Sequence, residues 1–459
     1  MLNNILIILF LLGYTWLIWR QPVRGVYIIT LLLPTYLIRF VWLNIPFTLL
    51  EMMIGLLFIV WLIKLGLNHQ LNLRFSAWLS RLWKNTKSVN KNYNLIPPLL
   101  RWPIIAVLAT SLIAWLVSPN WLGAAGIWKA YFFEPVLFFI LFVYLIRKNS
   151  QLKNIINALA ILSFVIFIYA LIQKTTGWNI NNLEWLLPAT RRVTTFFGYP
   201  NANGLLLAPL VIIFLASLWL PDRLVGKILR AVALIGAWLT MFWANSEGAL
   251  IGAALGSITV LLLFKNTRFI ATVFIGLAIV GLVLHPSTKE AVWQKITLQD
   301  FSGQIRQAQW TESLSMLRDN PWRGGGLANY QNALIPYHRS GLTINGQWQP
   351  IEIFLYPHNI LLNFWTELGL LGLLAIIWLG LAGCVLLLRL FIILPKLPKY
   401  KQTDSRPWAI GLTGIAVAII IHGLVDVPYF KNDLSVLAWL FLGIIVVVYN
   451  YSLEKNISN

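Results

Sequence analysis

Long apolar runs, separated by short polar segments, dominate the hydrophobic pattern of the chain. A helix needs about 20 mostly apolar residues to cross the core of a bilayer, and about 13 runs approach that length, the first of them short. We expect spans at 4–19, 25–43, 46–66, 102–118, 127–146, 154–173, 204–220, 230–245, 248–264, 269–284, 359–391, 408–424 and 434–450. The pattern predicts an all-α fold, a polytopic transmembrane helical bundle of about 12–13 spans, in which residues 1–459 form a single membrane domain.

Three polar segments between these spans are longer than a tight turn. Residues 67–101 form a basic loop, and the other two segments cover 174–203 and 285–357. The segment 285–357 contains amphipathic stretches, so we expect a large loop with short interfacial helices. Because loops carry function more often than spans do, the chemistry should lie where 174–203 and 285–357 meet.

The charge is unbalanced, with 35 Lys and Arg against 15 Asp and Glu and a net charge of +20. The chain is 59% hydrophobic and 11% charged, which excludes a soluble globular protein and a disordered chain. A basic chain could bind nucleic acid, but most of the basic residues lie in loops on one side of the predicted bundle, as the positive-inside rule requires of cytoplasmic loops. We therefore expect a lipid bilayer and no nucleic acid as partner, with 67–101 and the C-terminus inside, and the N-terminus, 174–203 and 285–357 outside.

The sequence contains few candidate ligands for a metal ion. Cys384 is the one cysteine, and the five histidines are widely spaced, so neither a disulfide framework nor a zinc cluster is expected. The outer segments contain no Asp-x-Asp pair and no carboxylate cluster. We expect neither a metal nor a cofactor.

A few ionisable residues lie within or at the ends of spans, where a charge costs roughly 2.5–3.5 kcal/mol or more. Glu51, Lys129 and Glu134 need partners on other helices and are either structural ion pairs or functional groups. His422 and Asp426 are four residues apart and share a helix face, so they form either a structural hydrogen bond or a proton relay.

The first long outer segment combines two arginines with a turn. Arg191 and Arg192 precede Gly-Tyr-Pro-Asn-Ala-Asn-Gly, which contains Asn201 and Asn203 and leads into a span. Two adjacent arginines either bind lipid headgroups or hold a diphosphate through their guanidinium forks. Further along, the Asn-Ser-Glu-Gly turn between two spans is either purely structural or places Glu247 at the site.

The second long outer segment has three parts. Residues 304–318 predict an amphipathic helix with Trp310, Leu314 and Leu317 on one face and Arg306 one turn before Trp310. A turn with three glycines, 324–326, follows; it lacks the strand before it and the Lys-Ser/Thr after it that a nucleotide P-loop needs.

The third part opens a long span with Tyr-Pro-His-Asn, residues 356–359. Pro357 marks a helix start, and Asn359, Asn363 and Glu367 then form a polar stripe at helical spacing. His358 would sit at the positive end of the helix dipole, which favours a neutral imidazole that can act as a general base. The alternative is an interfacial histidine with a structural hydrogen bond.

An enzyme on the outer face of a bacterial membrane has no nucleoside triphosphates and needs a substrate activated beforehand. A lipid-linked diphosphate sugar is such a substrate. Arginines would hold its leaving group, a base would deprotonate an acceptor hydroxyl, and tryptophans, of which the chain has 23, could stack on sugar rings.

Several short motifs in a fixed order resemble the O-antigen ligase / O-antigen polymerase family. The set consists of Arg192-x-x-Thr-x-Phe, Pro200-Asn-Ala-Asn203, Ser246-Glu-Gly248, Arg306-x-x-x-Trp310, Pro321-Trp-x-Gly-Gly-Gly326 and Pro357-His-Asn359 with Glu367-x-Gly-x-x-Gly372. The resemblance covers most of the chain from about residue 100. It departs from the family at Glu247, where many relatives have arginine, and in the outward N-terminus.

The resemblance implies a membrane glycosyltransferase of the GT-C type that works without a metal. It would move a glycan from undecaprenyl diphosphate to a glycolipid, polysaccharide or protein on the outer (periplasmic or extracellular) face of the cytoplasmic membrane, for the biosynthesis of cell-surface polysaccharide. His358 would be the catalytic base, and Arg192, with Arg191 as an alternative, and Arg306 would bind the diphosphate. The supporting residues would be Asn201, Asn203, Glu247, Trp310, Asn359 and Glu367.

Ligase and polymerase remain open alternatives within the family. A flippase or transporter of lipid-linked sugar is the main alternative from another class. It would need polar residues through the middle of the membrane and inverted repeats, and the sequence has no evident repeat.

Overall fold

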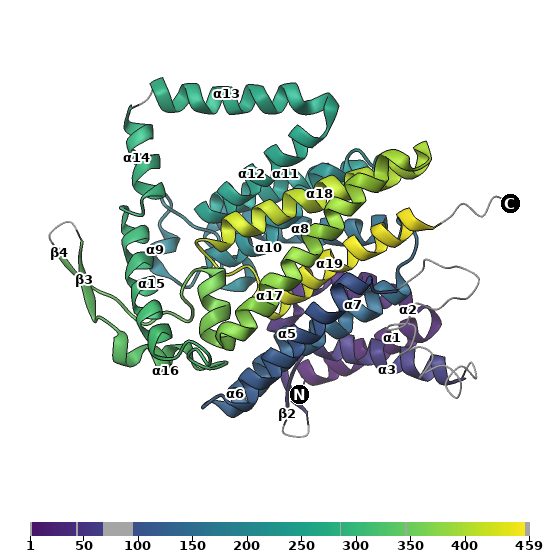
Figure 1. Cartoon of the computed structure of the whole chain (residues 1–459), viewed down its shortest axis with the longest axis horizontal. Helices are drawn as coiled ribbons and strands as arrows, with labels where there is room; N and C mark the ends of the chain where they lie inside the picture. Colours follow the sequence, from purple (N-terminus) through teal and green to yellow (C-terminus); the bar gives the residue numbers. More distant parts are fainter. Residues whose placement is uncertain (1, 43–44, 68–94, 285, 345–346, 455–459) are drawn as a thin grey trace.

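The computed structural model describes residues 2–42, 45–67, 95–284, 286–344 and 347–454 and shows an almost entirely helical protein (Figure 1). The prediction of an all-α membrane bundle is confirmed. Most of the predicted basic loop 67–101 lies outside the described residues.

The described elements follow one another with short connections. In chain order they are α1 (Leu2–Arg20), α2 (Pro22–Leu31), η1 (Leu33–Leu37), β1 (Arg39–Trp42), β2 (Ile45–Thr48), α3 (Leu49–Leu67), α5 (Pro98–Leu116), α6 (Trp121–Trp128), the π-helical η2 (Lys129–Phe133), α7 (Glu134–Leu145), α8 (Asn149–Thr176), α9 (Leu183–Leu186), η3 (Thr195–Phe197), α10 (Pro200–Ser217), α11 (Leu224–Trp243), α12 (Glu247–Leu263), η4 (Lys265–Thr267), α13 (Arg268–Leu284), α14 (Pro286–Ile296), α15 (Phe301–Asp319), α16 (Tyr330–Leu334), η5 (Ile335–Tyr337), β3 (Gly341–Ile344), β4 (Gln347–Pro350), α17 (Ile360–Ile393), η6 (Leu394–Lys396), α18 (Lys399–Gly423) and α19 (Asn432–Leu453).

Within the described part of the chain, nine helices are long and apolar enough to cross a membrane. They are α3, α5, the continuous α6–η2–α7, α8, α10, α11, α17 with η6, α18 and α19. The predicted spans 248–264 and 269–284 form a further pair, α12 and α13, bent by 113°. In Figure 1, α13 turns back from α12 along one edge of the bundle and leads into α14.

The predicted span 25–43 is wrong as a continuous helix. α2 ends at Leu31, and the chain continues as the 3-10 helix η1 and the hairpin of β1 and β2. Pro34 has no N–H to donate to the carbonyl four residues earlier and its ring crowds the preceding turn, so it disfavours continuation of α2 as an α-helix. At the first turn of η1 the same proline is tolerated.

The core of the bundle is formed by helices that are apolar on every side. Nearly all residues of α10 and most of α19 are buried, as expected for a helix without a polar face. α12 packs very closely on α18 because Gly256 and Gly414 face each other. A Cβ added at either glycine would lie 2.7 Å from the backbone carbonyl of the other. Small residues permit such close approach of two helices in a membrane.

The segments between α13 and α17 gather at one end of the bundle, here called the loop end. In Figure 1, α14 and α15 run across this end, with α16 and the β3–β4 hairpin beside them, whereas α19 ends on the opposite side. The predicted helix 304–318 is confirmed as α15, but its predicted apolar face is wrong. Leu317 is buried, whereas Leu314 is exposed, because the buried face of α15 also includes Gln309, Glu312 and Ser313.

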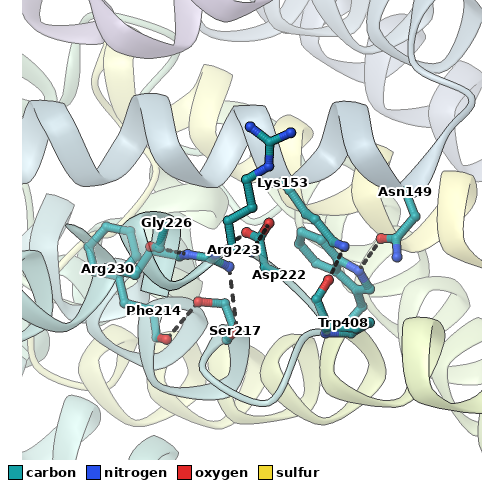
Figure 2. A network of polar contacts seen from close by, with 10 residues as sticks. Asn149, Lys153, Phe214, Ser217, Asp222, Arg223, Gly226, Arg230 and Trp408 are labelled. Atoms are coloured by element: carbon teal, nitrogen blue, oxygen red, sulfur yellow. Dashed lines mark hydrogen bonds and ion pairs between the residues drawn. The ribbon is translucent and has the colours of Figure 1, made fainter. Parts of the chain in front are cut away.

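The opposite end of the bundle contains a buried arginine. The side chain of Arg230 is fully buried and forms an ion pair with Asp222, and it also donates to the carbonyls of Gly226 and Ser217. Figure 2 shows these contacts, with the side chain of Arg223 directed away from them. The network closes the turn between α10 and α11.

Asp222→Ala is expected to destabilise the protein by about 3 kcal/mol or more, because it leaves a buried guanidinium without its counter-charge. A melting curve of the purified protein in detergent measures this. The control is Arg223→Ala, which removes an exposed charge next to Asp222 and should leave the melting temperature nearly unchanged. Equal melting temperatures for the two variants would contradict the prediction.

Candidate active site at the loop end

The predicted helix start at 357–359 is confirmed, and it places His358 at the loop end. Asn359 is the N-cap of α17, and its side-chain Oδ1 accepts hydrogen bonds from the backbone N–H groups of Leu361 (3.0 Å) and Leu362 (3.1 Å). His358 precedes the cap with a φ of 47°, in the left-handed region. Asn, Asp and His are the side chains most often found there.

Asn359 also joins the start of α17 to the end of α18. Its Nδ2 donates to the backbone carbonyl of Leu424 at 3.1 Å. This hydrogen bond brings the loop that follows α18 beside His358. As a result, Oδ1 of Asp426 lies 3.5 Å from Nδ1 of His358.

His358 and Asp426 are arranged as a histidine–carboxylate pair whose N···O distance of 3.5 Å is longer than that of an ordinary hydrogen bond. Nδ1 of His358 is buried, and among the described residues it has no hydrogen-bond partner of standard length and angle. A small rotation of the ring would complete the bond to Asp426, and such bonds are often long in enzymes without substrate. The carboxylate itself is nearly buried and accepts from the backbone N–H of Val427 at 2.8 Å.

The charge state of Asp426 follows from its neighbours. Burial raises the pKa of this carboxyl, but hydrogen bonding to His358 and the charges of His358 and His422 outweigh burial, so the pKa lies below its ordinary value. Asp426 is therefore an anion at neutral pH. The sequence predicted a contact of Asp426 with His422, whereas among the described residues the ionisable side chain within 4.0 Å of this carboxylate is His358.

His422 lies instead against the start of α12. A Cβ added at Gly248 would lie 3.1 Å from Cδ2 of His422. The end of α18 therefore packs on the turn between α11 and α12 through His422 and the following Val425.

The helix α15 covers the other side of His358. The indole Nε1 of Trp310 donates to the carbonyl of Pro357 at 2.8 Å. One turn earlier, Nε of Arg306 is buried and has no hydrogen-bond partner among the described residues. The charge of Arg306 also acts on His422. Among the described residues, Nε of Arg306 is therefore an unused donor one turn before the indole that contacts Pro357.

Arg192 is held at the turn between α11 and α12. Its Nε donates to the carbonyl of Ala244 (2.9 Å), and its Nη2 donates to the carbonyl of Asn245 (3.2 Å) and to Oδ1 of Asn201 (3.3 Å). Burial lowers the pKa of Arg192 and the carboxylate of Glu247 opposes this shift, but an arginine stays charged in proteins. Glu247 itself forms an ion pair with Lys295 of α14.

The two adjacent arginines face different elements. Arg191 donates to the carbonyls of Leu186 (3.2 Å), Lys174 (2.9 Å) and Thr175 (3.1 Å), so it caps the end of α8. Of the pair, Arg192 is the one that lies at the turn next to His422.

The predicted supporting residues mainly organise the backbone. Asn203 is fully buried; its Oδ1 accepts from Thr195 (2.7 Å), and its Nδ2 donates to the carbonyls of Val193 (3.2 Å) and Pro200 (3.3 Å). Glu367 is buried and accepts from the N–H of Ala328 at 2.7 Å. These contacts fix the first outer segment and hold the second one on α17.

The stripe Asn359, Asn363 and Glu367 does not act as one surface. Asn359 caps α17 and Glu367 binds the backbone of the outer segment, whereas both amide atoms of Asn363 are buried without a partner among the described residues.

The glycine-rich turn 324–326 packs against α17, and the N–H groups of Gly324 and Gly325 are already hydrogen-bonded. The N–H of Gly324 donates to Asn320 (2.8 Å) and that of Gly325 to Thr366 (2.7 Å). A Cβ at Gly324 would lie 2.4 Å from the carbonyl oxygen of Trp365, and one at Gly369 would lie 1.9 Å from that of Trp322. These glycines let the two backbones touch where α17 has its non-helical residue.

A family model described as O-antigen ligase matches residues 231–377, the segment from α11 to the middle of α17. Over this segment the chain is similar to the O-antigen ligase family. The match supports the family that the motifs resemble, and with it a glycosyltransferase-like function of the ligase or polymerase kind in a multi-pass membrane protein. A comparison with curated proteins finds no match.

The O-antigen ligase match contains Arg306 and His358, whereas Arg192 and Asp426 lie outside it. Sequence reasoning missed the contact of Asp426 with His358. The available signal was an acidic residue directly after the end of a span, on the side where His358 was expected.

Gly369→Ala is expected to reduce both folding yield and melting temperature. Residue 369 has a φ of 71°, which costs any residue with a side chain about 1–3 kcal/mol, and the added Cβ would collide with the turn 321–326. Gly276→Ala in α13 is the matched control, because a Cβ there meets nothing within 4 Å. Size-exclusion profiles and melting curves measure the difference, and a Gly369→Ala protein as stable as the control would contradict the described packing.

Proposed function

We propose that this enzyme transfers a glycan from a polyprenyl diphosphate carrier to a hydroxyl group of an acceptor. The observation that carries the proposal is the His358–Asp426 pair at the loop end, which α15 covers through Trp310, one turn after Arg306. The family assignment supports this class of reaction. The acceptor hydroxyl belongs to a glycolipid, a polysaccharide or a protein. A ligase and a polymerase differ only in this acceptor, so the same site would serve either reaction.

In the proposed reaction, His358 acts as the general base. Asp426 accepts a hydrogen bond from Nδ1–H of His358, which leaves the lone pair of Nε2 free to take the proton of the acceptor hydroxyl. The hydroxyl oxygen attacks the anomeric carbon, and the bond from this carbon to the diphosphate oxygen breaks. The bonding electrons leave with the diphosphate, and Asp426 stabilises the imidazolium that has formed, as carboxylates do in other base-assisted transfers.

Arg192 and Arg306 would stabilise the leaving diphosphate. Guanidinium groups donate two parallel hydrogen bonds to phosphate oxygens and keep their charge. They supply the positive charge that a divalent metal supplies in other transferases, so we propose that the enzyme is metal-independent and of the GT-C type. Arg306 has a free donor for this purpose.

We propose that the loop end faces the outside of the cytoplasmic membrane. The opposite end carries Lys153, Arg223 and other basic residues of the short loops, as the positive-inside rule expects of the cytoplasmic side. A lipid-linked donor would then reach the site within the outer leaflet of the bilayer.

The direct test is transfer of a labelled glycan from its polyprenyl diphosphate to an acceptor by purified enzyme in detergent. A flippase or transporter makes no new glycosidic bond, so labelled product separates the two classes. Transfer should persist in EDTA; its loss on chelation, with recovery by a divalent metal, would contradict the metal-independent mechanism.

His358→Asn is expected to lower the transfer rate by about 10²–10⁴-fold, the usual contribution of a general base. Asparagine tolerates the left-handed backbone at this position, so the variant should fold. Asp426→Asn should also lower the rate strongly, because it no longer orients the ring. Asp319→Asn, an exposed change at the same end of the bundle, is the control. Parental rates in both site variants would contradict the assignment.

Arg306→Lys is expected to lower transfer by about 10²-fold, because an ammonium cannot reproduce the two-pronged contact with a developing anion. Arg318→Lys makes the same change at an exposed position of the same helix and should retain the parental rate. Initial rates at saturating donor compare the two. Equal rates would show that Arg306 does not contact the leaving group.

A further inference from the structure

Lys431 occupies a cage of aromatic rings at the loop end. Its Nζ lies 5.4 Å from the ring centre of Tyr36, 4.9 Å from that of Phe197 and 4.9 Å from that of Tyr199. The three rings come from two segments far apart in the sequence, η1 and the first outer segment. A lysine held by rings from such separate parts of the fold has a defined position.

The cage attracts the ammonium group, and the hydroxyl of Tyr36 also forms a hydrogen bond with it. Ring faces stabilise a cation electrostatically, but an ammonium carries three N–H donors, for which oxygen atoms are better acceptors than rings. In the described residues no carboxylate oxygen lies within 4.0 Å of Nζ of Lys431. The group is therefore a positioned cation without a carboxylate in direct contact among the described residues, although its charge acts on the buried Asp433 nearby.

The cage is continuous with the proposed active site. Tyr356 packs edge-on against His358, with ring centres 4.7 Å apart. Burial raises the pKa of Tyr199 and of Tyr356. The charge of Asp426 adds to both shifts, after that of Asp433 at Tyr199, and Tyr199 itself acts on Tyr356. Tyr199 then contacts Lys431.

Lys431 and Arg192 contact the same short stretch of the first outer segment. Lys431 lies against Phe197 and Tyr199, and Arg192 donates to Asn201 two residues further along. Two cations thus flank residues 197–201, while His358 and Arg306 lie on the side of α15 and α17.

We propose that Lys431 is an anion-binding residue of this site, which holds one phosphate of the carrier diphosphate while an arginine holds the other. This inference rests on the proposed function. A lysine is a compact point charge and is well suited to one phosphate group. The cage keeps the ammonium in place and excludes water from part of it, which strengthens its attraction for an anion.

The test uses the full-length enzyme in detergent and two probes without glycan, polyprenyl diphosphate and polyprenyl monophosphate. The parental enzyme should bind the diphosphate more tightly. Lys431→Met keeps the length of the side chain and its packing in the cage but removes the charge, and it should lose about tenfold or more in affinity for the diphosphate. Its affinity for the monophosphate should change little, so the preference for diphosphate largely disappears.

Two further variants distinguish phosphate binding by Lys431 from a purely structural role of Lys431 in the cage. Lys431→Arg restores the charge and should recover most of the preference. Lys64→Met removes another lysine that lies over a ring, 5.9 Å from Trp19, at the far end of α3, and should leave the preference intact. Melting temperatures of all variants are measured beside the affinities.

The outcomes separate this inference from the proposed function. If Lys431→Met keeps the preference for diphosphate, Lys431 does not bind phosphate, although the enzyme can still transfer glycan. If Lys431→Met loses affinity for both probes with a lower melting temperature, and Lys431→Arg does not recover it, the cage is a structural tie only and the proposal is overturned. If the parental enzyme binds neither probe, the proposed donor is wrong and the inference falls with it.

Discussion

The side-chain amide of Asn359 makes two connections at the start of α17. Its oxygen accepts from two N–H groups of the first helical turn, and its nitrogen donates to the carbonyl of Leu424 after α18. An N-cap contributes typically about 1 kcal/mol to a helix, but the geometric effect here is larger than this energy suggests. The same amide fixes the direction of the residue before the cap, His358, and the position of the loop that supplies Asp426.

The site is assembled from parts that lie far apart along the chain. α15 supplies Trp310 and Arg306, the first outer segment supplies Arg192, and the loop after α18 supplies Asp426. What holds these parts together is mostly backbone contact, since α12 meets α18 through paired glycines and the turn 321–326 meets α17 through others. A few side-chain hydrogen bonds, such as those of Asn359 and Trp310, then fix the details of the site on this framework.

Much of the fold could be predicted from local pattern. Apolar runs give the spans, Pro-His-Asn gives the start of α17, and the spacing in 304–318 gives α15. The failures at the site share one cause, which is that they depend on contacts between distant segments. Nothing near Asp426 reveals that its partner is 68 residues earlier, and nothing in Arg191-Arg192 reveals that one side chain caps α8 while its neighbour reaches the turn before α12.

The left-handed backbone of His358 limits what evolution can place there. A position with φ near 47° accepts glycine, asparagine, aspartate or histidine far more readily than β-branched or bulky side chains. Within that short set, glycine and asparagine cannot take a proton, and an aspartate is a weak base at neutral pH. Of these residues, histidine alone fits both the shape of this turn and the proposed role as a proton acceptor. Replacement of His358 by glycine, asparagine or aspartate is therefore expected to give folded but inactive proteins.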